Sequence, residues 1–225
     1  MELLNCLSQD PDIPELELSV ISERMDPVTP AFGSKASHGY AFQNKQVFLP
    51  THTFENAPRL DVLIVPGGAG TRASDTEMEK YCKFIRIQYC GEGGEPPLKY
   101  IFSVCNGSRL LAGAGILNGQ KATTNKKQWL QVTSLTCNTH WLAKARWVVS
   151  GNIWTCSGVS AGVDGMAAFI EEVYGEDPAA RACDEAEYTR HLEEDDPFAE
   201  KYGCADVLGH FDRVNIVKEQ AVKQV

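Results

Sequence analysis

The residue best suited to chemistry is Cys105, which follows an apolar run at residues 99–104 and precedes small and polar residues at 106–108. A buried strand, one residue at a sharp turn and then small residues opening a helix are the plan of a nucleophile elbow. A thiol there faces free backbone N–H groups and the positive end of a helix dipole, and both favour the reactive thiolate. The alternative is a buried structural cysteine.

A glycine-rich turn, Pro-Gly-Gly-Ala-Gly at residues 66–70, follows a second apolar run at 61–65. The carboxyl ends of neighbouring parallel strands meet at one crevice, so we expect this turn to lie near Cys105. Its backbone N–H groups would then point at a developing anion, as in an oxyanion hole. The alternative is a tight turn that needs glycine. A phosphate-binding loop is disfavoured because no Gly-Lys-Ser/Thr sequence follows.

Strands and helices alternate along the chain, which predicts an α/β, doubly wound (flavodoxin-like) fold: a mostly parallel sheet with helices on both faces. The predicted strands are 15–22, 61–65, 99–104 and 121–124, with a hairpin of 145–149 and 153–156 and short extended pieces near 39–42 and 46–49. The predicted helices are 1–8, 75–89 with Asp75 as its cap, 107–114, 126–132, 161–174 and 177–192, with a weak helical pattern at 213–223. The acidic runs, including 193–196, are expected to be solvated.

The composition is that of a globular protein of one domain: 225 residues, 43% hydrophobic and 23% charged. Lys and Arg number 21 against 30 Asp and Glu, a net charge of −9, which argues against a nucleic-acid or anionic-membrane surface. No apolar run approaches the ~18 residues of a membrane helix, and the first residues lack a secretory signal pattern. We therefore expect a cytoplasmic protein with reduced cysteines. None of the eight cysteines forms a CxxC pair, so we expect no metal, and we expect no cofactor.

Together the two motifs resemble the ThiJ/PfpI superfamily, which is related to the class I glutamine amidotransferase fold. The resemblance covers most of residues 1–190 and includes VPGG at 65–68, VCNGS at 104–108, and the stretches 110–125 and 143–175. The last two stretches are most similar to the isonitrile hydratase branch and its fungal relatives. The resemblance implies a homodimer, and it predicts a domain at 1–192 followed by a polar C-terminal extension at 193–225.

In that branch the thiolate attacks the terminal carbon of an isonitrile, water adds to the thioimidate, and an N-substituted formamide leaves. Carried over to this sequence, Cys105 is the nucleophile that acts on a small-molecule substrate. The N–H groups of Gly68 and Asn106 are the polar donors. Ser160 caps the helix that lines the site, and Val159 and Trp154 form pocket walls. The implied role is tailoring or detoxification in secondary metabolism.

The chain departs from the superfamily pattern after the Thr-Thr pair at 123–124. Many members have a histidine at the next position, where this chain has Asn125. Asparagine cannot serve as a general base, which weakens a Cys/His reaction. The alternatives are a glyoxalase- or amidase-like enzyme of the same superfamily, and a non-catalytic thiol sensor or pseudoenzyme.

A second departure concerns the beginning of the domain. Members of the superfamily open with a strand followed by an acidic residue that hydrogen-bonds the cysteine, whereas residues 1–5 here match only the tail of the following helix. In the doubly wound order the missing strand would lie between the segments 16–21 and 61–65. Its loss would leave backbone groups unpaired on both neighbours. We hypothesise that activity is weak or absent unless another acid replaces the missing one.

Overall fold

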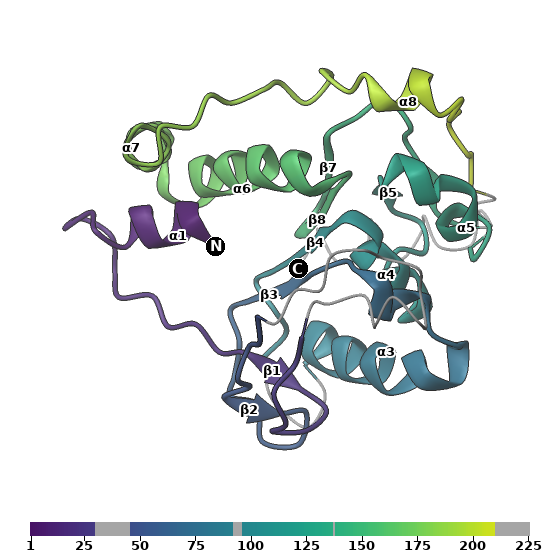
Figure 1. Ribbon diagram of the computed structural model, residues 1–225, viewed down its shortest axis with the longest axis horizontal. Helices are drawn as coiled ribbons and strands as arrows, with labels where there is room; N and C mark the ends of the chain where they lie inside the picture. The colour runs from purple at the N-terminus through teal and green to yellow at the C-terminus, as the bar shows by residue number, and fades with distance from the viewer. Residues whose placement is uncertain (30–45, 92–95, 137, 210–225) are drawn as a thin grey trace, which may run out of the picture.

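The computed structural model describes residues 1–29, 46–91, 96–136 and 138–209, and its centre is a four-stranded sheet (Figure 1). The strand order is β3 (Val62–Val65), β4 (Tyr100–Val104), β8 (Ile153–Cys156) and β7 (Trp147–Ser150). The first three strands run parallel and β7 pairs antiparallel with β8. The predicted hairpin and the predicted mostly parallel sheet are therefore confirmed.

Helices pack on both faces of the sheet because successive side chains of a strand point to opposite sides. On β4, Ile101 lies in the apolar cluster built with α3 (Asp75–Cys90), α4 (Ser108–Gly113) and α5 (Trp129–Thr133). The next residue, Phe102, lies in the cluster built with α1 (Glu2–Leu7), α6 (Val159–Tyr174) and α7 (Glu176–Glu185). Both side chains are fully buried. The remaining short elements are η1 (Ala69–Arg72), η3 (Cys105–Gly107), η4 (Lys126–Gln128), α8 (Phe198–Lys201), and the parallel pair β5 (Lys121–Ala122) and β6 (His140–Trp141).

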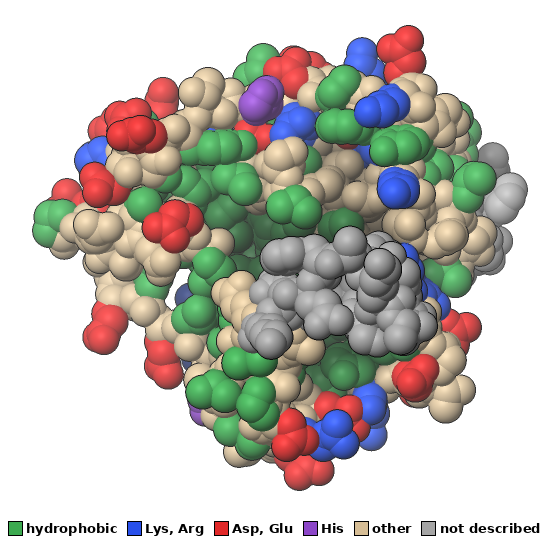
Figure 2. Space-filling view, in the orientation of Figure 1, with side chains coloured by type: hydrophobic (Ala, Val, Ile, Leu, Met, Phe, Trp, Pro, Cys, Tyr) green, Lys and Arg blue, Asp and Glu red, His purple; other side chains and the backbone are tan. Residues whose placement is uncertain are grey.

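The predicted strand at 15–22 forms only at its end. β1 (Ile21–Ser22) pairs with β2 (His52–Thr53) and not with the central sheet. Within the described ranges, β3 pairs with β4 on one side and with no strand on the other. Leu16 and Leu18 stay 38% and 57% exposed, because an alternating segment becomes a strand only when a neighbour supplies the hydrogen bonds. Figure 2 shows hydrophobic side chains gathered in a hollow on this face of the molecule.

One local prediction needs correction, and two others lie outside the described residues. The helix α3 is capped by Ser74, not by Asp75: the Ser74 side chain accepts from the Glu77 N–H while the Glu77 carboxylate accepts from Ser74. This reciprocal pattern is a capping box. The predicted extended piece at 39–42 and helical pattern at 213–223 lie outside the described residues.

The segment 193–209 is fastened to the domain by side chains that the sequence does not single out. Asp196 was expected to be solvated, but it is 5% exposed and pairs with Lys126 at 3.2 Å, so that prediction is wrong. Further along, Asp206 accepts from the Ala143 N–H at 2.7 Å, and Val207 forms a β-bridge with Trp141. A buried carboxylate is stable here because a cation neutralises it.

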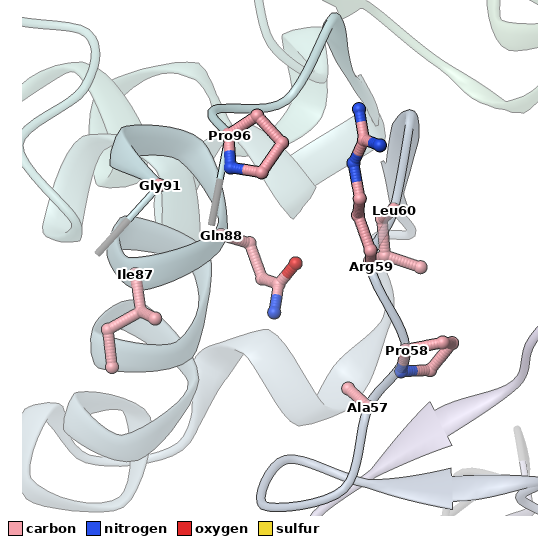
Figure 3. Close-up of a pocket in the computed structure, with 8 residues that line it drawn as sticks. All are labelled: Ala57, Pro58, Arg59, Leu60, Ile87, Gln88, Gly91 and Pro96. Carbon is pink, nitrogen blue, oxygen red and sulfur yellow. The ribbon is translucent and has the colours of Figure 1, made fainter. Parts of the chain in front are cut away.

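A small pocket of about 130 Å³ lies between the segment before β3 and the end of α3 (Figure 3). It is lined by Ala57, Pro58, Arg59, Leu60, Ile87, Gln88, Gly91 and Pro96. This position is at the amino end of β3, whereas Cys105 follows the carboxyl end of the parallel strand β4. The pocket therefore lies at the opposite end of the sheet from the thiol.

Among the described residues, no helix combines the length and the apolar character that crossing a bilayer requires.

Candidate active site

Cys105 occupies the sharp turn between β4 and the helical residues that follow. Its φ angle is +59°, in the left-handed region that residues with a Cβ rarely adopt. The turn packs directly on β3: a Cβ at Gly107 would lie 2.4 Å from the Val65 carbonyl oxygen, so only glycine fits there. The strained backbone and the close approach are the geometry of a nucleophile elbow.

The glycine-rich turn lies against this elbow, as the sequence predicts. Asn106 joins the two turns, because its Oδ1 accepts from the Gly68 N–H at 2.8 Å and its Nδ2 donates to the Gly68 carbonyl at 3.3 Å. A Cβ at Gly67 would lie 2.5 Å from Asn106 Oδ1 and 2.8 Å from the Cys105 Cβ. The prediction that the Gly68 N–H serves the reacting centre is corrected, since that N–H is already bound to the Asn106 side chain.

The loop 123–126 closes a further side of the elbow. The Thr124 hydroxyl donates to the Cys105 carbonyl at 3.3 Å, and Ser108 Oγ donates to Thr124 Oγ1 at 2.8 Å. All of these polar groups are buried or half-buried. The loop is therefore held against the backbone of the candidate nucleophile.

The pKa of the Cys105 thiol is not lowered overall, although the helix dipole alone would lower it. Burial raises the pKa of Cys105 above its ordinary value, although the Asn106 N–H, the Arg72 cation and the Asn125 side chain each act to lower it. Burial dominates because the thiolate loses its hydration and the helical segment behind it is short: three residues of η3 and six of α4. The helix N-terminus favours the thiolate, as predicted, but burial opposes it more strongly.

The three predicted pocket residues lie in different surroundings. Trp154 is 4% exposed in the core, opposite Phe102 in the β4–β8 register and edge-on to Phe169. Val159 is 78% exposed on the first turn of α6. Gly158, not Ser160, is the N-cap of that helix.

The hydroxyl of Ser160 is engaged elsewhere. It accepts from Arg146 Nη2 at 3.3 Å, and Arg146 is itself paired with the buried Asp164. The N-cap side chain is the one that reaches the free N–H groups of the second and third helical residues, and that position is held by Gly158, two residues before Ser160.

Sequence reasoning missed the residues that hold the loop beside the thiol. Lys126 and Asp196 form a buried ion pair although they are 70 positions apart in the chain, and no local sequence pattern predicts such a pair. The signal that could have indicated a buried polar partner is the Thr-Thr-Asn-Lys run at 123–126. Most of these polar side chains are buried, and buried polar groups must find hydrogen-bond or charge partners. Over the part of the chain that the structure describes, no group of three His, Cys, Asp or Glu side chains is placed to hold a metal ion.

The fold and the elbow define a class: flavodoxin-like α/β proteins with a cysteine at a strained strand-to-helix turn. Comparison with known families agrees, since the model of the DJ-1/PfpI family matches residues 16–173. The chain belongs to the DJ-1/PfpI (ThiJ/PfpI) family.

Among curated proteins, the chain is 33% identical over 176 residues to the isonitrile hydratase of Pseudomonas putida, covering 78% of this chain and 68% of that protein. Among solved structures, it is similar to a ThiJ/PfpI family protein from Pseudomonas syringae, with 30% identity and a TM-score of 0.62. That match covers 78% of this chain and 64% of the solved chain, so this chain spans less than two thirds of that relative.

A third similarity concerns the fold alone. Drosophila melanogaster DJ-1beta is 20% identical, with a TM-score of 0.51, over 64% of this chain and 74% of that one. The same core of sheet and helices therefore persists where most of the sequence has changed.

Proposed function

We propose that this chain is an isonitrile hydratase-like lyase in which Cys105 adds water to an isonitrile and forms an N-substituted formamide. The observation that carries the proposal is the thiol at a strained elbow, in a chain 33% identical to an isonitrile hydratase. A side chain held in an unfavourable backbone conformation is typical of a functional position.

The chemistry balances without a cofactor. The sulfur of Cys105 bonds to the terminal carbon of R–N≡C while a proton is added to that carbon, which gives the thioimidate R–N=CH–S–Cys. Water then adds across C=N, so that the carbon gains OH and the nitrogen gains H. The C–S bond breaks, the sulfur recovers a proton, and R–NH–CHO leaves.

Protons must move at both the sulfur and the water during the reaction. The rate therefore depends on a nearby group that can accept and donate them. The described neighbours that act on the thiol are Arg72, Asn106 and Asn125, and none of these three is a carboxylate. The hypothesis of weak activity from the sequence therefore stands as part of the proposal. Because burial raises the thiol pKa, the reactive thiolate fraction at neutral pH is small and grows as the pH rises toward that pKa.

The test is hydration of p-nitrophenyl isocyanide by the full chain, followed by chromatography of the formamide. Turnover above the uncatalysed rate is expected, with a rate that increases from pH 6 to pH 9 and is abolished in Cys105→Ala. Cys90→Ser, which changes an exposed cysteine, is the matched control and should keep the wild-type rate. Formamide production that survives Cys105→Ala contradicts the proposal.

Two alternative functions are distinguished by parallel measurements on the same chain. A glyoxalase- or amidase-like enzyme would act on methylglyoxal or a small amide and leave the isonitrile unchanged. A thiol sensor would show oxidation of Cys105 by mild peroxide without turnover. The homodimer, the cytoplasmic location and a role in secondary metabolism stay predictions.

A further inference from the structure

The pocket between the segment before β3 and the end of α3 has no part in the proposed reaction (Figure 3). It lies at the amino end of β3, whereas Cys105 follows the carboxyl end of the parallel strand β4. Its volume of about 130 Å³ is large enough for a solute of several non-hydrogen atoms. A ligand bound in this pocket would therefore not touch the thiol.

Direct contacts hold the first wall of the pocket, the segment before β3, in place. At its start, the ring of Phe54 stacks on Phe84 of α3, with the ring centroids 4.6 Å apart. At its end, the Asp61 carbonyl accepts from the Lys99 and Tyr100 N–H groups at 3.0 and 3.1 Å. This wall is therefore anchored at both ends.

The second wall, the end of α3, is tied to the strands of the central sheet. The Gln88 carbonyl accepts from the Leu98 N–H at 3.3 Å, just before β4. The Tyr89 hydroxyl donates to Asn152 Oδ1 at 3.1 Å, just before β8. Both walls are thus in place before any ligand arrives, so binding does not carry the entropic cost of ordering them.

Two polar side chains line the pocket without a protein partner. Across the described ranges, the Arg59 guanidinium forms no ion pair or hydrogen bond, and the Gln88 carboxamide forms no hydrogen bond. Figure 3 shows the Gln88 side chain extending from α3 toward the wall that carries Arg59. Asp61, two residues further along, is already paired with Lys99 at 3.0 Å. The pocket therefore presents an unneutralised cation in a chain whose net charge is −9.

These groups define the chemistry of a ligand that would fit. A guanidinium presents paired N–H donors in a planar fork that matches the two oxygens of a carboxylate, and the Gln88 amide adds a further donor. The C-terminal end of a helix carries partial negative charge, which disfavours a doubly charged anion such as hydrogen phosphate. Ala57, Pro58 and Pro96 supply apolar contacts for a short hydrocarbon chain.

We propose that this pocket binds a short-chain monocarboxylate, of the size of propionate or butyrate, through Arg59 and Gln88. Binding is reversible and forms no covalent bond. The inference goes beyond the proposed function and does not depend on it, because the pocket and the thiol lie at opposite ends of the parallel strands.

The experiment titrates propionate into the ¹⁵N-labelled full chain at neutral pH and constant ionic strength, and follows the backbone amide resonances. We expect saturable shifts concentrated at Arg59, Gln88 and Gly91, with a dissociation constant of about 1 mM for so small a ligand. Propionamide, which has the same shape without the charge, should produce no saturable shifts. Hydrogen phosphate should bind more weakly than propionate.

Variants identify the groups that hold the ligand. Arg59→Gln removes the guanidinium and should weaken propionate binding by about tenfold or more, and Arg59→Lys, which keeps the charge but not the fork, should weaken it less. Gln88→Ala should weaken it by about threefold. Lys83→Gln, which removes the same charge from an exposed position on α3 outside the pocket, is the matched control and should bind as the wild type does.

Three outcomes would overturn the proposal. One is wild-type affinity for propionate in Arg59→Gln, or shifts that do not saturate. Another is equal affinity for chloride or hydrogen phosphate, which would show an adventitious ion only. The third is protection of Cys105 from iodoacetamide by propionate, which would place the ligand at the candidate active site instead of this pocket.

Discussion

The centre of the sheet and the region before β3 contain similar apolar patterns but differ in structure. Residues 99–104 become β4, which has a paired neighbour on each side and helices on each face. Residues 15–20 alternate, yet they form no strand and leave Leu16 and Leu18 exposed. The difference shows that an apolar pattern supplies the tendency to form a strand, whereas the neighbouring strands supply the burial.

The same contrast separates two kinds of polar residue. Near Cys105 the polar groups of Thr124, Lys126 and Asp196 are buried and paired, so the loop has one arrangement. In the region before β3, Glu23 pairs with Lys80 and Arg24 with Asp26, and these side chains are exposed. Exposed pairs contribute little to stability because water screens them. The following substitutions test whether the rigidity of the molecule is concentrated on the side of the elbow.

The largest effect is expected from Lys126→Ala. It leaves the Asp196 carboxylate buried without its cation, which costs about 3–5 kcal/mol in the free energy of unfolding. Lys127→Ala, at the exposed neighbouring position, is the control and should change stability by no more than about 0.5 kcal/mol. Urea denaturation measures both. Equal effects for the two variants would show that the buried pair does not hold the loop.

A somewhat smaller loss is expected from Gly107→Ala. The added Cβ would lie 2.4 Å from the Val65 carbonyl oxygen, so β3 and the elbow must separate, at a cost of about 3 kcal/mol. Gly70→Ala is the control in the neighbouring turn, because a Cβ there meets no atom within 4 Å. Thermal unfolding should show a lower Tm for Gly107→Ala alone, and a wild-type Tm would contradict the close packing of the two turns.

Matched leucines measure the contrast between the two regions directly. Leu111→Ala removes a fully buried side chain from α4 and should lower stability by about 2–5 kcal/mol. Leu18→Ala removes a side chain that is 57% exposed and should stay within about 0.5 kcal/mol. Chemical denaturation of the pair tests this. A large loss at Leu18 would mean that the region before β3 is packed more closely than the structure shows.

The smallest expected effect is a gain at the elbow itself. Cys105→Gly should be more stable than Cys105→Ala by about 1 kcal/mol, since glycine tolerates the φ of +59° and alanine does not. Differential unfolding of the two inactive variants provides the measurement. If alanine proves as stable as glycine, the turn is not strained in solution, and the argument from backbone strain to function loses its support.

Much of the architecture could be predicted from the sequence because it depends on local patterns. The apolar runs at 61–65 and 99–104 are strands, and the Gly-rich turn lies against the cysteine elbow as expected. The burial of Trp154 and the exposure of Val159 could not be predicted, because strand register and helix rotation decide which way a side chain points, and neither is visible locally. The prediction that the Gly68 N–H is a free donor was wrong, because the tertiary structure decides which acceptor an N–H group meets.

The sequence by itself determined the class of fold, the strands at 61–65 and 99–104 and the position of the thiol between a strand and a helix. These features follow from the periodicity of apolar residues and from glycines at positions where two backbone segments pack closely. The tertiary structure alone decided that burial raises the thiol pKa, that the Thr124 hydroxyl is bonded to the Cys105 carbonyl, and that Asp196 reaches Lys126 from 70 positions away. The physical reason is that burial and charge pairing depend on which distant segments meet.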